Sequence, residues 1–296
     1  MKNEEWSEAD IPDQGGKFIV LSGATSGIGK EVAKAAAAKN ARIVCGVRDL
    51  VKAEAIGREI LSRHPQAQVS FLHLDLCRLE SVKSFAAKIR AEFPRIDVLI
   101  NNAGVMMCPF SRTFDGFEIQ IGINHLSHFA LTGQLLEHQQ SNGRIVAVSS
   151  LGHFTGRPDL SDLNWERRRY NSLRAYWDSK LVNLSFVFEL VRRLRDREIK
   201  VVASHPGWTK TGLQRHSRML WVFNLLLAQD VTIGALPILR AAFDDQVVTG
   251  DYFGPSRFFE MHGSPTRVGS SKRAHDPELA RIFWERSEEF TGVRFS

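Results

Sequence analysis

The chain is poor in cysteine and lacks any long apolar run. Its three cysteines, Cys45, Cys77 and Cys108, are an odd number without the spacing of a metal site. They are expected to be reduced thiols, which indicates a cytoplasmic location. No run reaches the ~20 apolar residues that a transmembrane helix needs, so none is predicted. Residues 1–14 are polar and acidic, unlike a secretory signal, and are expected to form a loose tail before one domain over 15–296.

Acidic residues are outnumbered by basic ones. The net charge is +6 and the sequence pI about 9.4. Such a balance can indicate nucleic-acid binding, but no recognition motif accompanies it. Several basic residues lie between Arg192 and Arg197, at the C-terminal end of a predicted helix, where cations complement the helix dipole. No nucleic-acid partner is therefore predicted, and attraction to an anionic membrane surface remains an alternative.

Short apolar runs alternate with helical stretches along the chain. Strands are expected at residues 18–21, 43–47, 69–74, 96–100, 144–148, 201–203 and 247–253. Helices are expected at residues 30–39, 50–63, 79–93, 114–139, 175–197, 231–243 and 277–290. This alternation favours an α/β architecture: a single-domain, doubly wound Rossmann fold with a mostly parallel seven-stranded sheet and helices on both faces.

A glycine-rich turn follows the first predicted strand. The run SGATSGIG, residues 22–29, stands between that strand and an alanine-rich helix. In this setting backbone N–H groups and a helix N-terminus hold a pyrophosphate, and glycine permits the close approach. The predicted phosphate-binding residues are Gly23, Ser26, Gly27, Ile28 and Gly29.

Tyr176 and Lys180 lie four residues apart in a predicted helix, which places both on one helix face. A free phenol is a poor acid or base near neutral pH because its pKa is about 10. A neighbouring ammonium group favours the phenolate, so the pKa of Tyr176 is expected to be lowered. The pair then suits proton transfer in carbonyl–alcohol chemistry.

Residues at the ends of the predicted strands are expected to contact a dinucleotide. NAD enzymes tend to carry a carboxylate at the end of the second strand, but Val47 stands there. Arg48 follows and is assigned to a 2′-phosphate, the alternative being a solvated loop charge. Asp75 and Leu76, after the third strand, are assigned to the adenine. The turn after the fourth strand, with Asn102, Ala103 and Gly104, is expected to lie against the cofactor.

Four motifs together resemble the short-chain dehydrogenase/reductase family. They are S-G-x-x-x-G-x-G at 22–29, N-N-A-G at 101–104, Y-x-x-x-K at 176–180 and P-G at 206–207, and the resemblance covers about residues 15 to 290. Ser22 departs from the usual threonine but keeps the hydroxyl. Residues 45–49, 123–129 and 204–207 are most similar to the retinol-dehydrogenase-like branch.

The resemblance implies a catalytic tetrad. Asn124 would help hold a water in a proton relay, and Ser150 would polarise the substrate carbonyl, with Ser149 as the fallback. Tyr176 would donate or accept the proton. Lys180 would lower the pKa of Tyr176 and bind the nicotinamide ribose. The long spacer between Ser150 and Tyr176, around residues 157–173, is expected to bulge at the rim of the site.

The resemblance also assigns Pro206, Gly207, Thr209 and Thr211 to the segment that binds the nicotinamide carboxamide. His125 and His128 share a helix face, but no third ligand has suitable spacing, so no metal site is predicted.

These observations predict an oxidoreductase that uses NADP(H) to interconvert a lipophilic alcohol, retinoid-like or lipid-derived, and its aldehyde or ketone. The alternatives are an NAD-linked alcohol or steroid dehydrogenase and a noncatalytic nucleotide-sensing scaffold. The apolar segment 219–228 is interpreted as a lid over the substrate that also touches a membrane surface. A helix in the core or at a homodimer interface is the alternative for that segment.

Overall fold

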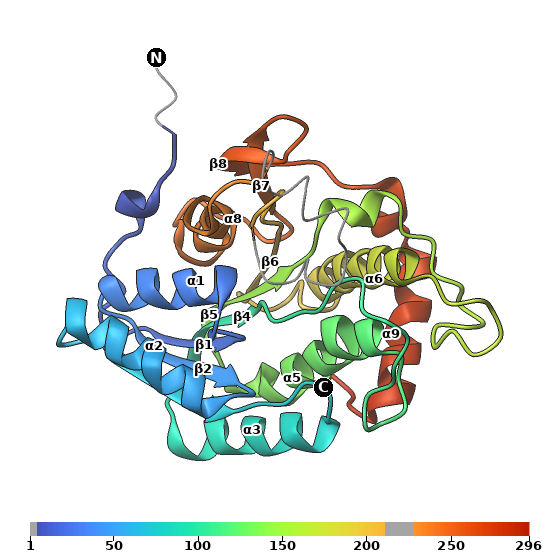
Figure 1. Cartoon of the computed structure of the whole chain (residues 1–296), viewed down its shortest axis with the longest axis horizontal. Helices are drawn as coiled ribbons and strands as arrows, with labels where there is room; N and C mark the ends of the chain where they lie inside the picture. Colours follow the sequence, from blue (N-terminus) through green and yellow to red (C-terminus); the bar gives the residue numbers. More distant parts are fainter. Residues whose placement is uncertain (1–4, 211–227, 296) are drawn as a thin grey trace.

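A computed structural model describes residues 5–210 and 228–295. Eight strands form one sheet in the order β3-β2-β1-β4-β5-β6-β7-β8 (Figure 1). Neighbouring strands are parallel except for the last pair, β7 and β8. The strands are Phe18–Ser22 (β1), Arg42–Val47 (β2), Gln68–His73 (β3), Ile96–Asn101 (β4), Gln139–Val148 (β5), Lys200–Ser204 (β6), Tyr252–Arg257 (β7) and His262–Arg267 (β8).

Helices cover both faces of the sheet (Figure 1). They are Gly27–Ala38 (α1), Leu50–Arg63 (α2), Leu79–Glu92 (α3), Ile119–Ile121 (α4), Ser127–Leu135 (α5), Ser172–Arg193 (α6), Val231–Phe243 (α8) and Pro277–Thr291 (α9). Alternate residues of β1 belong to two different core clusters, as the two-residue period of a strand requires. Buried residues of α1, α2 and α8 pack into one cluster, and those of α3, α5, α6 and α9 into the other.

The order of the strands reverses between β1 and β4. The chain moves from β1 outward through β2 to β3 and then returns to pair β4 with β1. In open parallel sheets a ligand binds beyond the carboxyl ends of the strands at such a reversal. The glycine-rich turn after β1 and the turn after β4 therefore meet where the sequence places the cofactor.

The sheet differs from the predicted one at its end. It has eight strands rather than seven, because the polar segment His262–Arg267 forms an antiparallel edge strand. Its residues do not alternate between apolar and polar, so the sequence carries no strand pattern there. The seventh strand is Tyr252–Arg257 instead of 247–253, since a turn with Gly250 at φ 87° precedes it.

The long helix predicted over 114–139 is also interrupted. Residues before Ile119 form a turn in which Gly116 has φ 88°. The Glu118 carboxylate caps the helix by accepting from the backbone N–H groups of Gln120 and Ile121. A π-helical segment, Gly122–Leu126, then leads into α5, and Gln139 already belongs to β5.

The expectation of a loose N-terminal tail is wrong for the described residues. Ile11 is only 2% exposed and belongs to the same core cluster as α1 and α8. The Glu5 carboxylate accepts hydrogen bonds from Arg257 and Ser264 of the β7–β8 hairpin.

Part of the predicted machinery lies outside the described residues, namely Thr211 and nearly all of the proposed lid at 219–228. Among the described helices, none combines the length and apolar character needed to span a membrane.

Phe129 on α5 should be a main support of the helical layer that holds the site. Its ring is fully buried and contacts the rings of Phe186, Trp284 and Phe295. Phe129→Ala is expected to lower the free energy of unfolding by about 3–5 kcal/mol, because it leaves a cavity among aromatic rings. Chemical denaturation would measure the loss. Phe259→Ala, at a site 93% exposed, is the control and should change that free energy by no more than about 0.5 kcal/mol.

Candidate active site

The glycine-rich turn approaches the β4 turn too closely for side chains. Gly23 has φ +76°, and a Cβ there would lie 2.8 Å from the Cβ of Ala103. A Cβ on Gly29 would lie 1.7 Å from the carbonyl oxygen of Gly23. Gly27 begins α1 with φ 56°, and the exposed Ser26 side chain forms no capping hydrogen bond. The N-terminus of α1 thus presents backbone N–H groups and a hydroxyl at the predicted phosphate position.

Hydrogen bonds fix this turn to the end of β4. The Ser22 Oγ accepts from the backbone N–H groups of Asn102 and Ala103, at 2.9 and 3.1 Å. The Asn102 Nδ2 donates in turn to the carbonyl oxygens of Ser22 and Gly23, at 2.9 and 2.8 Å. The amide of Asn102 therefore holds the glycine-rich turn in place, and the predicted cofactor contact would come from the rest of the residue.

His128, on α5, connects this turn to Asn124. Ser22 Oγ already accepts two hydrogen bonds, so its own hydrogen is left to donate. Of the two acceptors within reach, His128 Nε2 at 2.8 Å is closer than the carbonyl oxygen of Ile100 at 3.4 Å, so the hydrogen bond goes to His128. The Nδ1–H of His128 then donates to the carbonyl of Asn124 at 3.1 Å. Burial lowers the pKa of His128 to about 4, so the ring is neutral near pH 7. Sequence reasoning assigned His128 no such role, because Ser22 lies 106 positions away.

Tyr176 and Lys180 both lie on α6, one turn apart as predicted. The Lys180 Nζ is 5.7 Å from the centre of the Tyr176 ring and donates to the carbonyl of Val148 at 3.1 Å. Ser150 follows β5, and its hydroxyl is close enough to the Tyr176 phenol to act on the pKa of that group. Three groups of the predicted tetrad therefore meet at the carboxyl end of β5.

Between the two adjacent serines, the structure favours Ser150. The Ser149 Oγ donates to the backbone carbonyl of Lys180 at 2.8 Å and is buried. The Ser150 Oγ is partly exposed and accepts from the N–H of Gly152 at 3.2 Å, which leaves its own hydrogen for Tyr176. Ser149, the fallback, supports the helix backbone instead.

Asn124 lies beside these groups, in the π-helical segment. Its Oδ1 accepts from the Val105 N–H, and its Nδ2 donates to the Val105 carbonyl and to Ser179 Oγ. Both N–H groups of the amide are therefore committed within the protein. A Cβ on Gly104 would lie 3.1 Å from this Oδ1 and 3.8 Å from Lys180 Nζ, so the N-N-A-G turn directly adjoins the tetrad.

The pKa of Tyr176 differs from the expectation. Burial raises it above the ordinary value, and the hydrogen bond from Ser150 acts in the opposite direction. The expected net lowering is thus wrong for the protein by itself. Burial also lowers the pKa of Lys180 to about 8, so the ammonium form still predominates near pH 7.

Arg48 lies exposed at the start of the loop after β2. It forms no ion pair with any residue in 5–210 or 228–295, whereas its neighbour Asp49 caps α2 and pairs with Lys52 at 3.4 Å. Arg48 is close enough to Cys77 to act on the pKa of that thiol. Its guanidinium therefore lies near the segment after β3 that contains the residues assigned to the adenine.

Those residues are held by local bonds. The Asp75 Oδ1 accepts from the N–H of Cys77 at 3.0 Å, and its Oδ2 lies 3.7 Å from Arg78 Nε. Leu76 is buried, and its carbonyl accepts from Ser127 Oγ at 2.7 Å. The described part of the carboxamide segment is equally constrained. Gly207 has φ +64°, and the Thr209 Oγ1 donates to the carbonyl of Pro206 at 2.7 Å.

The long segment between Ser150 and Tyr176 is attached to α6. The Asp178 carboxylate accepts from the backbone N–H of Arg157 at 2.8 Å and lies 3.8 Å from Arg168. The Tyr170 hydroxyl donates to the buried Glu118 carboxylate at 2.8 Å. The segment is therefore packed against the helix that carries Tyr176.

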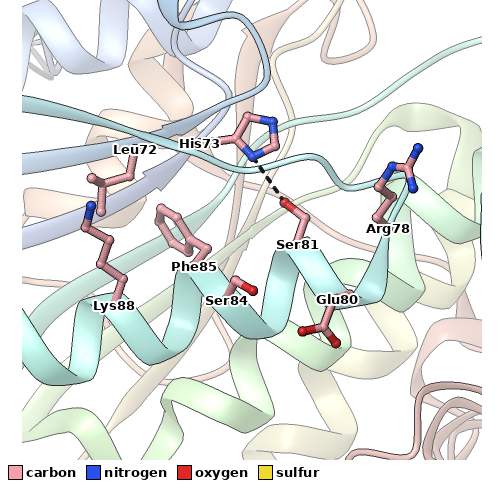
Figure 2. Close-up of a pocket in the computed structure, with 8 residues that line it drawn as sticks. All are labelled: Leu72, His73, Arg78, Glu80, Ser81, Ser84, Phe85 and Lys88. Carbon is pink, nitrogen blue, oxygen red and sulfur yellow. Dashed lines mark hydrogen bonds between the residues drawn. The ribbon is translucent and has the colours of Figure 1, made fainter.

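A groove of about 420 Å³ lies elsewhere, between β3 and α3 (Figure 2). Leu72 and Phe85 give it an apolar floor, and Arg78, Glu80 and Lys88 stand around it. The His73 Nδ1 and the Ser81 Oγ are 3.5 Å apart, at the limit of a hydrogen bond. The groove shares no residue with the predicted tetrad.

Comparisons with known proteins agree with this arrangement. A family model described as short chain dehydrogenase matches residues 17–219. Human retinol dehydrogenase 13 is 39% identical over 300 residues, covering 97% of this chain and 87% of that protein. Human retinol dehydrogenase 12 is 38% identical over 287 residues, covering 95% and 88%.

Solved structures show the same fold. The crystal structure of an uncharacterised protein from Mycobacterium paratuberculosis has a TM-score of 0.85 and 39% identity, with 99% of this chain and 100% of that chain covered. A short chain dehydrogenase from Burkholderia cenocepacia in complex with NADP has a TM-score of 0.66 and 20% identity, with 81% and 96% covered.

The fold and the family match thus define a nicotinamide-dependent oxidoreductase built on a doubly wound sheet. The chain belongs to the short-chain dehydrogenase/reductase family, in its retinol-dehydrogenase-like branch.

Gly29→Ala should weaken dinucleotide binding. The new Cβ would lie 1.7 Å from the Gly23 carbonyl oxygen and 2.5 Å from the Asn102 Nδ2, so the turn must move. We expect the Kd for NADPH, followed by fluorescence titration, to rise by at least about tenfold, or 1.4 kcal/mol. Gly269→Ala is the control, because no atom lies within 4 Å of its Cβ. An unchanged Kd in a folded Gly29→Ala protein would contradict the assignment.

Proposed function

We propose that the protein is an NADP(H)-dependent oxidoreductase that interconverts a lipophilic alcohol and its aldehyde or ketone. The observation that carries this proposal is the meeting of Ser150, Tyr176 and Lys180 at the end of β5, beside the glycine-rich turn. A nonenzymatic nucleotide-binding scaffold would need the turn but not an arrangement of proton donor, hydroxyl and buried ammonium group.

The described residues fit a dinucleotide. The N-terminus of α1 suits the pyrophosphate. The lack of a side chain at Gly29 lets this helix end lie close against the carbonyl oxygen of Gly23 and the amide of Asn102. Asp75, Leu76 and the backbone of Asn102–Gly104 would line the adenosine half, and Lys180 with Pro206, Gly207 and Thr209 the nicotinamide half. When bound, the cofactor supplies or accepts the hydride.

Proton transfer would fall to the side chains of this chain. When substrate binds, the Ser150 hydroxyl would turn its one hydrogen from the Tyr176 oxygen to the substrate oxygen, which polarises the carbonyl carbon. Tyr176 would give its phenolic proton to that oxygen as negative charge develops on it. Because burial raises the pKa of Tyr176, the phenol is protonated near pH 7, as a donor must be.

The substrate class rests on the relatives. Three human relatives at 38–39% identity are retinol dehydrogenases by name, which supports a retinoid-like or lipid-derived substrate. A long apolar substrate would also suit a protein at the surface of a membrane, where such compounds partition. Peripheral contact with a membrane and assembly as a homodimer are also part of this proposal. NAD-linked oxidation of an alcohol or steroid is the competing candidate.

The Tyr176 hydroxyl should be required for turnover. Tyr176→Phe is expected to keep NADPH binding and to lose at least ~10²-fold in kcat, the scale of a general acid. The measurement is NADPH absorbance with a panel of lipophilic aldehydes and ketones. Tyr170→Phe is the control, because it also removes a phenol hydroxyl. Tyr170 lies in the long segment before α6, and its hydroxyl donates to Glu118. Comparable turnover by Tyr176→Phe and wild type, where chemistry limits the rate, would refute the role.

Arg48 should select NADPH over NADH. Its guanidinium suits a 2′-phosphate through forked, charge-assisted hydrogen bonds. Arg48→Ala is expected to weaken NADPH binding by about 1.5–3 kcal/mol, the range for hydrogen bonds to charged groups, and to leave NADH binding unchanged. Arg58→Ala on α2 is the matched control, since that side chain is exposed and its only described ion pair is with Glu54. Equal affinity of the wild-type protein for both dinucleotides would exclude the assignment.

A further inference from the structure

His153 is a buried, ionisable residue to which neither the sequence motifs nor the proposed chemistry gives a role. It lies in the short 3-10 helix Leu151–Phe154 (η4) that follows Ser150, and its side chain is fully buried. The Nε2 accepts from the backbone N–H of Ser271, at 3.2 Å, so Nδ1 carries the hydrogen. That Nδ1–H donates to the carbonyl of Ser150 at 2.7 Å.

The same turn fixes both oxygen atoms of Ser150. Its carbonyl accepts from the backbone N–H of His153 at 3.0 Å as well as from the ring. Its Oγ accepts from the N–H of Gly152 at 3.2 Å, which leaves the hydroxyl hydrogen available for another acceptor, and the Tyr176 phenol is near enough for this hydroxyl to act on its pKa. A side chain that holds the Ser150 carbonyl therefore also sets where the Ser150 hydroxyl points.

The imidazole joins this turn to a distant part of the chain. Ser271 precedes the short helix Lys272–His275 (η6), 118 positions after His153. The His153 ring also meets the Tyr252 ring of β7 edge-on, with centroids 5.5 Å apart. Burial lowers the pKa of His153 to about 4, so the ring stays neutral over the range in which an enzyme of this kind works.

We infer that His153 is a positioning residue, whose neutral imidazole clamps the Ser150 turn between β5 and Ser271 so that the Ser150 hydroxyl faces Tyr176. This inference rests on the proposed function, because it gives Ser150 and Tyr176 their roles. A purely structural histidine would stabilise the fold without affecting how Tyr176 titrates.

The position of the Ser150 hydroxyl also affects how the Tyr176 phenol titrates. The bond from Ser150 opposes the effect of burial on the pKa of Tyr176. If the Ser150 hydroxyl turns away, that pKa should rise, and alcohol oxidation, which needs the phenolate as base, should reach half its maximum at higher pH. The other charged or titratable groups that face His153 and Tyr176 are His205, Glu260, His275, Tyr252 and Lys180, and all of them are unchanged in the variants below.

Two substitutions separate the two shorter hydrogen bonds of the ring, to Ser150 at 2.7 Å and to Ser271 at 3.2 Å. The Tyr252 hydroxyl, 3.5 Å from Nδ1, is at the limit of a hydrogen bond. In His153→Asn the side-chain amide can occupy the Nδ1 position and donate to Ser150, but it does not reach Ser271. In His153→Gln the amide oxygen can occupy the Nε2 position and accept from Ser271, but the donor to Ser150 is lost. Both variants lose one buried hydrogen bond, so each is the stability control for the other.

We expect His153→Gln to lower kcat by about tenfold, the equivalent of one lost hydrogen bond, while the Kd for NADPH is unchanged. Its pH profile for alcohol oxidation should move to higher pH. His153→Asn should keep the wild-type profile and most of kcat. Equal losses of kcat in both variants, with unshifted profiles, would overturn the inference and leave His153 a structural residue.

A direct titration separates this inference from the proposed function. The chain has three tyrosines, so the ultraviolet difference between wild type and Tyr176→Phe isolates the ionisation of Tyr176. The same difference, measured in the His153→Gln background, should show that ionisation at higher pH. If the wild-type protein turns over no substrate of the panel, the proposed function fails, and this titration alone decides whether His153 positions Ser150. An unshifted titration overturns the inference even if turnover is normal.

Discussion

The hydroxyl of Ser22 is the junction on which the site depends. It binds two successive N–H groups of the β4 turn and donates to His128, so the end of β1, the end of β4 and α5 meet at one oxygen atom. From there hydrogen bonds continue through His128 to the carbonyl of Asn124, and through the Asn124 amide to Ser179. The Ser179 hydroxyl donates to the carbonyl of Tyr176 at 2.7 Å. A displacement of the glycine-rich turn would therefore be felt by the helix that carries Tyr176, because an unpaired buried polar group is costly.

Burial controls the electrostatics of this network. It acts against the charged form of each group, so it raises the pKa of Tyr176 and lowers those of Lys180, His128 and His153. Two histidines are thereby kept neutral and serve as fixed donor–acceptor bridges. Lys180 remains the cation among these four groups near pH 7. The ordinary chemistry of a phenol and an amine is thus altered more by removal from water than by mutual attraction.

The sequence was sufficient for the parts of the fold that depend on local pattern. The apolar runs predicted β1, β2, β3, β4 and β6 to within one residue at each end, whereas β5 begins at Gln139, in a polar stretch before the predicted strand. Most of these parallel strands are buried on both faces and are therefore apolar. It failed at β8, whose polar residues are ordered by pairing with β7, and at the π-helical segment before α5, where tertiary contacts override the helix pattern. It also failed at the N-terminal segment. Trp6 and Ile11 are isolated apolar residues in a polar stretch, and only the three-dimensional structure shows that Ile11 enters the core and that Trp6 packs against it.

The candidate site was likewise only partly predictable from the sequence. Motif spacing led to Asn124, Ser150, Tyr176 and Lys180, and the structure brings these four residues into one region. It could not lead to Ser22 as a junction, or to His128 and His153 as bridges. Each of these roles consists of a hydrogen bond to a group far away in sequence, which no local pattern encodes. The sign of the pKa shift at Tyr176 was missed for a related reason. Spacing on a helix shows which charges are neighbours, but desolvation depends on every segment that packs over the phenol.

The long segment before α6 contacts the helix that carries Tyr176 but supplies none of the predicted catalytic residues. It contacts the tetrad helix through Asp178, which lies between Tyr176 and Lys180 in sequence. Burial raises the pKa of Asp178 to about 6, and the Arg157 N–H and the Arg168 guanidinium oppose that effect. Arg168 in turn stacks on Trp165, 3.6 Å from the ring centre, and lies 3.6 Å from Asp162. Because a buried carboxylate needs such partners, the segment and the tetrad helix are fixed relative to each other.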